Sequence, residues 1–286
     1  MTTIMSKTIC VGALVLGLLG STATRSLAQD PTAPAQPQTA NPDSRLDPLQ
    51  PDFNLAALPT TLRLPAHKLS FRVTHRFLRP LGQGDFGDLL SNFFGLDNGA
   101  QIGLELRYGL MSGTQVGVHR TSDRTTEIFG QHSILQERDG HPVGLDGIVT
   151  LEGTNNLRDQ ISSALGAIVS RKVANVATVY AEPIFVANTN PDPGDAVDHN
   201  STLMLGLGGR LRIRPAAYVM AEYTPRLAGY DLGVDQISFG IEARAGGHLF
   251  QLNFSNAVGT TFGQIARGGV NNHSWYLGFN IARKFF

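Results

Sequence analysis

The sequence predicts an antiparallel transmembrane β-barrel of about twelve strands, within a range of roughly ten to fourteen. Three observations predict it. Many segments alternate apolar and polar residues with a period of two, the connections between them alternate between long and short, and the chain ends on an apolar, aromatic segment over residues 275–286. Each part of the chain is considered in order below.

Residues 1–28 are predicted to be a cleaved secretory signal peptide. Lys7 precedes an apolar run over residues 9–19, and small residues follow up to Ala28. The apolar run is about half of the ~20 residues that a membrane-spanning helix needs. The single cysteine, Cys10, lies within this segment, so the exported chain would have no disulfide and no cysteine-based metal site.

Residues 29–60 are predicted to form a Pro-rich, disordered periplasmic arm, and residues 61–286 the barrel. Six prolines lie within residues 31–51 among Ala, Gln, Thr and Asp, a composition that cannot bury a core. Removing Lys7 and Arg25 with the signal leaves 21 basic and 23 acidic residues, without a basic block. A nucleic-acid partner is therefore not predicted.

The strands are predicted from the period-two pattern. In the first, Leu69, Phe71 and Val73 alternate with Ser70 and Arg72. A soluble sandwich would bury the apolar face, whereas a membrane barrel turns it outward, and the period alone does not choose between them. Strands are predicted over residues 67–77, 100–110, 114–121, 125–135, 143–151, 161–171, 175–187, 201–214, 216–224, 235–245, 247–256 and 273–286.

The connections favour the membrane barrel. Those after the first, fifth, seventh, ninth and eleventh predicted strands are long, and those after the second, sixth, eighth and tenth are tight; the tight connection at residues 122–124 is an exception. Short periplasmic turns with longer outer loops are typical of outer-membrane barrels. We therefore expect the outer membrane of a diderm bacterium, with outer-membrane lipid and the barrel assembly machinery as partners.

The last predicted strand is expected to carry the assembly signal, because bacterial barrels commonly end on a Phe. Trp275, Phe279 and Ile281 share a face with Phe285, and Phe286 falls on the other face. Either Phe285 faces lipid, or a β-bulge shifts the end of the strand.

Several stretches resemble an uncharacterised family of bacterial β-barrel proteins, the domain-of-unknown-function family numbered 5777. The resembling stretches are residues 75–77, 94–97 leading into 106–109, 170–172, 221–226, and 247–252 with 255–256. The resemblance implies a barrel and no established activity. No functional residue is therefore carried over from it.

Charged residues gather on the predicted inward faces, where charges must be paired or wetted. Two interpretations stay open: a basic excess lines a water-filled route that favours anions, or Arg and Glu ladders cross-link a narrow lumen. Inward glycines such as Gly206 and Gly208 leave space and favour the pore. The predicted lumen-lining residues are Lys68, Arg72, Arg76, Glu105, Arg107, Arg210, Arg212, Glu222, Glu242 and Arg244.

The predicted function is a passive channel for small solutes with a weak anion preference. The first alternative is a closed structural or docking barrel that engages a partner through its loops or its N-terminal arm. The second is an interfacial lipid hydrolase, for which the outward His75 and His132 lack a serine motif. No enzyme activity, catalytic residue, cofactor or metal is predicted.

Two loops bear on these interpretations. Residues 188–200 hold three aspartates and His199, without the spacing of an EF-hand, so a solvated acidic loop is expected there rather than a Ca²⁺ site. Residues 85–94 have apolar residues at helical spacing, which predicts a short amphipathic helix over or in the barrel mouth.

Overall fold

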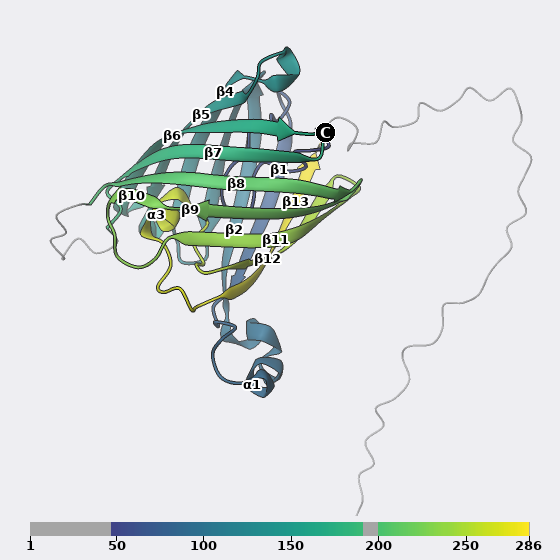
Figure 1. The fold of residues 1–286 in the computed structure, drawn as a ribbon. Coiled ribbons are helices and arrows are strands. Elements are labelled where there is room, and N and C mark those ends of the chain that lie inside the picture. Colours follow the sequence, from purple (N-terminus) through teal and green to yellow (C-terminus); the bar gives the residue numbers. More distant parts are fainter. Residues whose placement is uncertain (1–46, 191–199, 286) are drawn as a thin grey trace, which may run out of the picture. The chain divides into compact units, whose positions relative to one another are not determined.

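The computed structural model describes residues 47–190 and 200–285, and within them twelve antiparallel strands close a barrel (Figure 1). The strands are β1 (Leu69–Phe77), β2 (Ala100–Met111), β3 (Thr114–Thr121), β4 (Thr126–Leu135), β5 (Gly144–Gly153), β6 (Asp159–Val173), β7 (Ala177–Ala187), β8 (Thr202–Arg214), β9 (Ala217–Thr224), β11 (Gln236–Ala245), β12 (His248–Ser255) and β13 (Tyr276–Phe285). The first and last strands, β1 and β13, pair with each other and form the closing seam. A short extra strand, β10 (Arg226–Gly229), pairs with β8 alone.

The predicted fold class is confirmed, and the predicted strand bounds differ from the observed ones by at most three residues. The alternating pattern has the expected sense. Apolar side chains such as Leu104, Leu165 and Ile241 are exposed on the outer surface, while their neighbours Glu105, Ala164 and Glu242 are buried inside. An exposed apolar band of this kind is the lipid-facing surface of a membrane barrel.

The two ends of the barrel differ. Both β1 and β13 meet the end that carries the short connections 112–113, 174–176, 215–216 and 246–247, which we call the terminal end. The opposite, loop end carries the long connections 78–99, 188–201, 225–235 and 256–275. Another connection at the terminal end, residues 136–143, is longer than these four because it holds the short helix η3 (Glu137–Asp139).

Short helices lie in the connections at the loop end. The helix expected over residues 85–94 forms as α1 (Phe86–Ser91), followed by η2 (Phe93–Asn98), and Asp85 and Asp88 cap α1 reciprocally. Phe86 and Leu90 are exposed, and Figure 1 shows α1 beyond the strand ends, so this helix does not fill the mouth. The remaining helices are α2 (Thr154–Leu157) and α3 (Phe262–Arg267). Among the described residues, no helix is long and apolar enough to span a membrane.

The lumen is occupied by the chain itself. Residues 47–64, which we call the lumen hairpin, rise from the terminal end, turn over residues 55–58 and return to β1. At the turn, the Leu55 N–H donates to the Leu58 carbonyl at 2.7 Å, and below it the Thr60 N–H donates to the Phe53 carbonyl at 2.8 Å. Leu55 and Leu58 are fully buried.

Both arms of the lumen hairpin leave at the terminal end. Asp47 pairs with Lys172 at the end of β6, and the Leu64 N–H donates to Gln115 at the start of β3. The structure therefore moves the start of the barrel domain, because residues 47–60, which composition assigns to a disordered arm, lie inside the barrel. The predicted signal peptide and the arm up to residue 46 lie outside the described residues.

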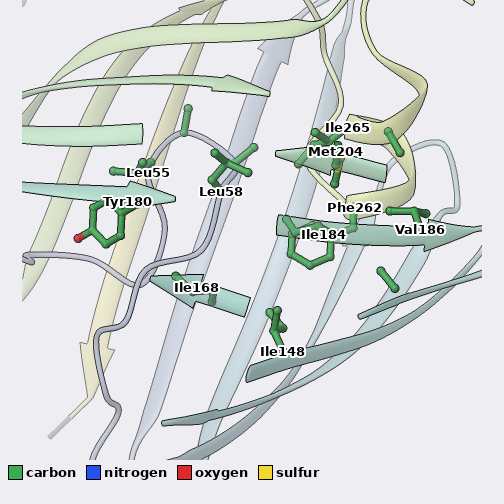
Figure 2. Close-up of a cluster of buried hydrophobic side chains, with 14 of the residues drawn as sticks. Leu55, Leu58, Ile148, Ile168, Tyr180, Ile184, Val186, Met204, Phe262 and Ile265 are labelled. Atoms are coloured by element: carbon green, nitrogen blue, oxygen red, sulfur yellow. The ribbon is translucent and has the colours of Figure 1, made fainter. Parts of the chain in front are cut away.

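One side of the lumen is an apolar core (Figure 2). Leu55 and Leu58 of the hairpin pack with apolar side chains that project inward from β5 to β9. The space above Gly206 is filled by Leu58, and the space above Gly208 by Leu55, whose Cδ1 would lie 2.3 Å from an added Cβ. The wall members of this cluster are Ile148, Ala164, Ile168, Tyr180, Ile184, Val186, Met204 and Met220.

Replacing both Leu55 and Leu58 by Ala should release the hairpin from the lumen without unfolding the barrel. Each truncation of a buried Leu removes about 2–5 kcal/mol of packing, and the sheet keeps all its strand pairs. Limited proteolysis should then cut within residues 53–60, while unboiled protein still migrates faster than boiled protein. Leu104→Ala on the outer face is the control and should leave the hairpin protected. An uncut hairpin in the double variant would contradict this packing argument.

Candidate functional site

The candidate site is the polar wall around the turn of the lumen hairpin. Seven of the predicted lumen-lining residues are buried inside the barrel: Arg72, Arg76, Glu105, Arg107, Arg210, Glu222 and Glu242. The other three, Lys68, Arg212 and Arg244, are partly exposed near the terminal end. The buried members divide into those that bind the hairpin and those that bind one another.

Two arginines of β1 bind carbonyl oxygens of the turn. Arg72 Nη2 donates to the Leu55 oxygen at 2.9 Å and to the Ala56 oxygen at 2.7 Å. Arg76 Nη2 donates to the Ala56 oxygen at 3.3 Å, and Asn280 Nδ2 of β13 donates to the same atom at 3.1 Å. Two guanidinium groups and an amide thus converge on one neutral oxygen.

Glu222 of β9 binds the other side of the turn. Its Oε2 accepts hydrogen bonds from the N–H groups of Ala56, Ala57 and Leu58 at 3.0, 3.0 and 3.1 Å, and its Oε1 accepts from Ala57 at 3.1 Å. A tight turn leaves such N–H groups without backbone partners, and bonds to an ionised carboxylate are stronger than neutral ones. Glu222 therefore holds the turn in place.

Other buried charges pair within the wall. Arg210 and Glu242 form a two-point pair, with Nε–Oε2 at 2.6 Å and Nη2–Oε1 at 2.9 Å. Arg107 binds Glu105 on the same strand, at 3.0 Å from Nε and 2.9 Å from Nη2. Neither pair joins neighbouring strands as the ladder interpretation expects, since β9 separates β8 from β11. Arg72 and Arg76 are bonded to the hairpin rather than to an acidic residue of the wall.

Helix α3 lies inside the loop-end mouth against β5, β6 and β7, and it is bound by a similar arrangement. The Phe262 N–H donates to Glu127 at 2.9 Å, and the Gly263 N–H donates to Glu152 at 2.8 Å. Arg267 at the last turn of α3 also binds Glu152, at 3.1 Å. Phe262 extends the apolar core of the lumen toward the loop end (Figure 2).

The sequence prediction missed both segments inside the lumen. For α3 a signal was present, since Thr261 and Gln264 have the spacing of a capping box and form one. For the hairpin the signal was the apolar group Phe53, Leu55 and Leu58, which directly follows the Pro-rich stretch. A composition window that includes the prolines hides it.

Some polar atoms on the opposite side of the lumen have no protein partner within the described chain. Thr74 Oγ1 and His119 Nε2 are both buried without a hydrogen bond, and both point into the space above Gly103. Burying such groups dry is costly, so the side of the lumen formed by β1 to β3 has the chemistry of a wetted surface. Glu182 of β7, within the apolar side, is also fully buried and neither carboxylate oxygen has a bond.

The predicted assembly-signal residues lie along the last strand. Phe279, Ile281 and Phe285 share the outward face of β13, and the pairing of β13 with β1 has no bulge, so Phe285 faces lipid. Trp275 directly precedes the strand and packs on Phe239 with ring centroids 5.6 Å apart. Phe286 lies outside the described residues.

The two outward histidines have ordinary packing roles. His75 stacks on Phe279 with ring centroids 4.5 Å apart, and His132 Nδ1 lies 2.8 Å from the Thr114 hydroxyl. Within residues 47–190 and 200–285, no group of three or more His, Cys, Asp or Glu residues could hold a metal ion. The acidic part of the loop over residues 191–199 lies outside the described residues.

Comparison with known families agrees with this architecture. Residues 52–285 match the family described as the membrane bound beta barrel domain, DUF5777. The chain belongs to this family. The match begins inside the lumen hairpin, so the hairpin's turn is part of the family's domain, and the resemblance seen in the short sequence stretches is confirmed.

Solved structures show a similar fold. The NanC porin has a TM-score of 0.51 at 8% identity, covering 76% of this chain and 99% of the porin chain. The KdgM porin in complex with disordered oligogalacturonate has 0.49 at 8% identity, covering 77% and 99%. The Acinetobacter baumannii outer membrane protein Omp33 has 0.46 at 9% identity, covering 77% and 98%. No curated protein matches the sequence.

Glu222→Gln should loosen the turn more than Glu242→Gln. The first change replaces a charged acceptor of three N–H groups by an amide with a single acceptor oxygen, at a cost of about 1–3 kcal/mol. Hydrogen exchange at Ala56, Ala57 and Leu58 should therefore be faster in Glu222→Gln. Glu242→Gln is the matched control, since it weakens the Arg210 pair and leaves these three bonds in place. Equal exchange in the two variants would show that Glu222 does not hold the turn.

Proposed function

We propose that the protein is an outer-membrane conduit for small solutes. The lumen hairpin closes the conduit in the described structure, and the conduit opens when the hairpin withdraws toward the terminal end. One observation carries the proposal. The hairpin pairs with no strand of the barrel, and every hydrogen bond between its turn and the barrel is made by a wall side chain. It can therefore leave without breaking a strand pair.

The wall that faces the turn supports passage of polar solutes. Arg72, Arg76, Gln251 and Asn280 come from β1, β12 and β13, and each donates to a hairpin carbonyl. Once the hairpin withdraws, these donors face the lumen, where they suit water or a solute. A polar interior of this kind is typical of barrels that conduct.

The same wall supports a weak anion preference. Asp52 of the hairpin lies 3.8 Å from Arg72 and 3.7 Å from Lys284, and it leaves with the hairpin. Arg210 and Glu242 stay paired in the wall, so the three cationic groups of Arg72, Arg76 and Lys284 then face the two carboxyl groups of Glu182 and Glu222. Rings of positive charge favour anions in channels.

The comparisons support the class of protein and leave the solute open. The family description gives a membrane barrel, and the porin likeness at 8% identity is a likeness of fold. No enzymatic step belongs to the proposal.

A permanently closed docking barrel is the second candidate. The apolar core favours it, because the core runs from Leu55 and Leu58 through Ile184 to Phe262 of α3. Withdrawing the hairpin exposes part of this core to water, at about 25 cal/mol for each Å² of apolar surface. The hairpin therefore closes the lumen at rest under either candidate function. A measurement of conductance distinguishes the two.

A disulfide that locks the hairpin should abolish conductance reversibly. The hydroxyls of Thr61 on the hairpin and Ser170 on β6 lie 2.6 Å apart, so Thr61→Cys with Ser170→Cys brings two sulfurs within bonding reach. Cys10 is replaced by Ser in the same chain. We expect intermittent single-channel steps in planar bilayers from the reduced protein, and none after oxidation.

The reduced and oxidised forms are the same polypeptide, which makes each the control for the other. A cysteine pair at Thr114 and His132, whose side chains meet on the outer face, gives an oxidised control that leaves the hairpin free. If neither reduced nor wild-type protein gives steps where a known porin does, the conduit is abandoned for the docking barrel.

Assembly into the outer membrane is expected to depend on the end of β13. Deleting Phe285 and Phe286 removes the last lipid-facing aromatic residue and the terminal Phe, and should reduce insertion several-fold while export continues. Heat-modifiable protein in the outer-membrane fraction is the measurement, and Phe250→Ala, on the outer face of β12, is the control. Normal insertion of the truncated chain would show that the barrel assembly machinery does not read these residues.

A further inference from the structure

The turn of the lumen hairpin is held as a bound peptide would be held. Its backbone carbonyls at Leu55 and Ala56 are bonded to Arg72, Arg76, Gln251 and Asn280 of the wall, and its N–H groups are bonded to Glu222. Segments inside proteins usually satisfy their backbone groups through secondary structure. Here side chains of the wall do so, which makes the wall a peptide-backbone receptor.

The carboxylate that the hairpin brings to this side of the receptor, Asp52, lies 3.8 Å from Arg72 Nε, while the Arg72 Nη2 group binds neutral carbonyl oxygens of the turn. Two guanidinium groups and the Asn280 amide meet at the neutral Ala56 oxygen. Arginine forms shorter and stronger hydrogen bonds with a carboxylate, frequently in a two-point arrangement. A ligand that places a carboxylate at the position of the Ala56 carbonyl would therefore be preferred to an uncharged peptide.

The donor side and the apolar side define the rest of the ligand. Glu222 accepts from the Ala56 N–H at 3.0 Å, the peptide N–H of the residue whose carbonyl the arginines bind, so it selects a ligand with a peptide N–H at that residue. The surfaces above Gly206 and Gly208 accept the Leu58 and Leu55 side chains, and a Cβ at either glycine would meet those leucines at 3.0 or 2.3 Å. These glycines leave room for branched apolar side chains.

We propose that this receptor is a solute-binding site of the conduit, and that its ligand is a short apolar peptide with a free carboxylate. The hairpin turn is then a tethered, uncharged competitor that occupies the site until a peptide displaces it. The inference rests on the proposed function and names its solute. Because a tethered segment acts at an effective concentration of the order of millimolar, the free peptide must also be supplied at about millimolar concentration.

The experiment uses the full chain with Ala57→Cys, and with Ser in place of Cys10. Ala57 is buried at the turn, so its thiol reacts only when the hairpin leaves. The labelling rate with a small thiol reagent in detergent is measured while acetyl-Leu-Ala is added, either as the free acid or as the C-terminal amide. When the Leu of this probe lies at the position of Leu55, its C-terminal group lies at the position of the Ala56 carbonyl. We expect a saturable rise in rate, with the acid acting at about tenfold lower concentration than the amide.

Two further variants test the assigned contacts. In Arg72→Gln, the acid and the amide should act at similar concentrations, because the carboxylate of the acid loses its main partner. Lys172→Gln is the matched control: it also removes a cationic partner of the hairpin, at Asp47, but lies near the terminal end, and it should keep the tenfold difference. Triglycine acid, which lacks apolar side chains, should act only at much higher concentration.

The outcomes separate this inference from the proposed function. Equal effects of acid and amide, or no effect of either in protein that shows single-channel steps, would overturn the peptide site and leave the conduit standing. Absence of steps in all forms would remove the conduit and the peptide site together. A preserved acid preference in Arg72→Gln would also refute the assignment of the carboxylate to this site.

Discussion

A polypeptide inside a closed barrel must satisfy its backbone polar groups without joining the sheet, and the structure of the lumen depends on this constraint. Glu222 meets it at the turn of the lumen hairpin, and Glu127 and Glu152 meet it at the first turn of α3. In each case an inward carboxylate of the wall accepts from the backbone of an inserted segment. Inward charge in this barrel is thus used largely to bind the protein's own chain.

The interior has two chemically different sides, and the difference explains both the closure and the possible route. On β5 to β9 a cluster of inward apolar side chains packs on Leu55, Leu58 and Phe262, which gives the inserted segments their hydrophobic stabilisation, although charged residues such as Glu222 lie on these strands as well. On β1, β12 and β13 the wall is polar and donates to the hairpin carbonyls. Withdrawal therefore costs free energy mainly on the apolar side and uncovers charge mainly on the polar side.

The strands and their faces could be predicted because the information is local. A period of two along ten residues is enough to place Arg72 and Glu242 inside and Phe71 and Ile241 outside. The same alternation allowed two outcomes at the end of the last strand: either Phe285 faces lipid, or a β-bulge shifts the strand end. The pairing of β1 with β13 has no bulge, so Phe285 faces lipid. Strand pairing follows from the order of the strands, since neighbours in sequence are neighbours in the barrel.

The partners of the inward charges could not be predicted in this way. Glu222 binds residues that lie 164–166 positions earlier in the chain, and no periodicity connects them. Gly206 and Gly208 were interpreted as free space for a pore, whereas that space holds Leu58 and Leu55. Parity reports which side of a strand faces inward, but it carries no information on what fills the inside.

The position of Ala56 has a consequence for the seam between β1 and β13. The Ala56 carbonyl oxygen accepts from Arg76 on one edge and from Asn280 on the other, and these two side chains also bond to each other at 2.8 Å. The hairpin thereby links β1 and β13, the first and the last strands in the chain, whose pairing closes the barrel. A barrel that gives up its hairpin loses both bonds to the Ala56 oxygen and keeps only the direct Arg76–Asn280 bond between these side chains, so the mechanical strength of the seam and the occupancy of the lumen are coupled through a single peptide oxygen.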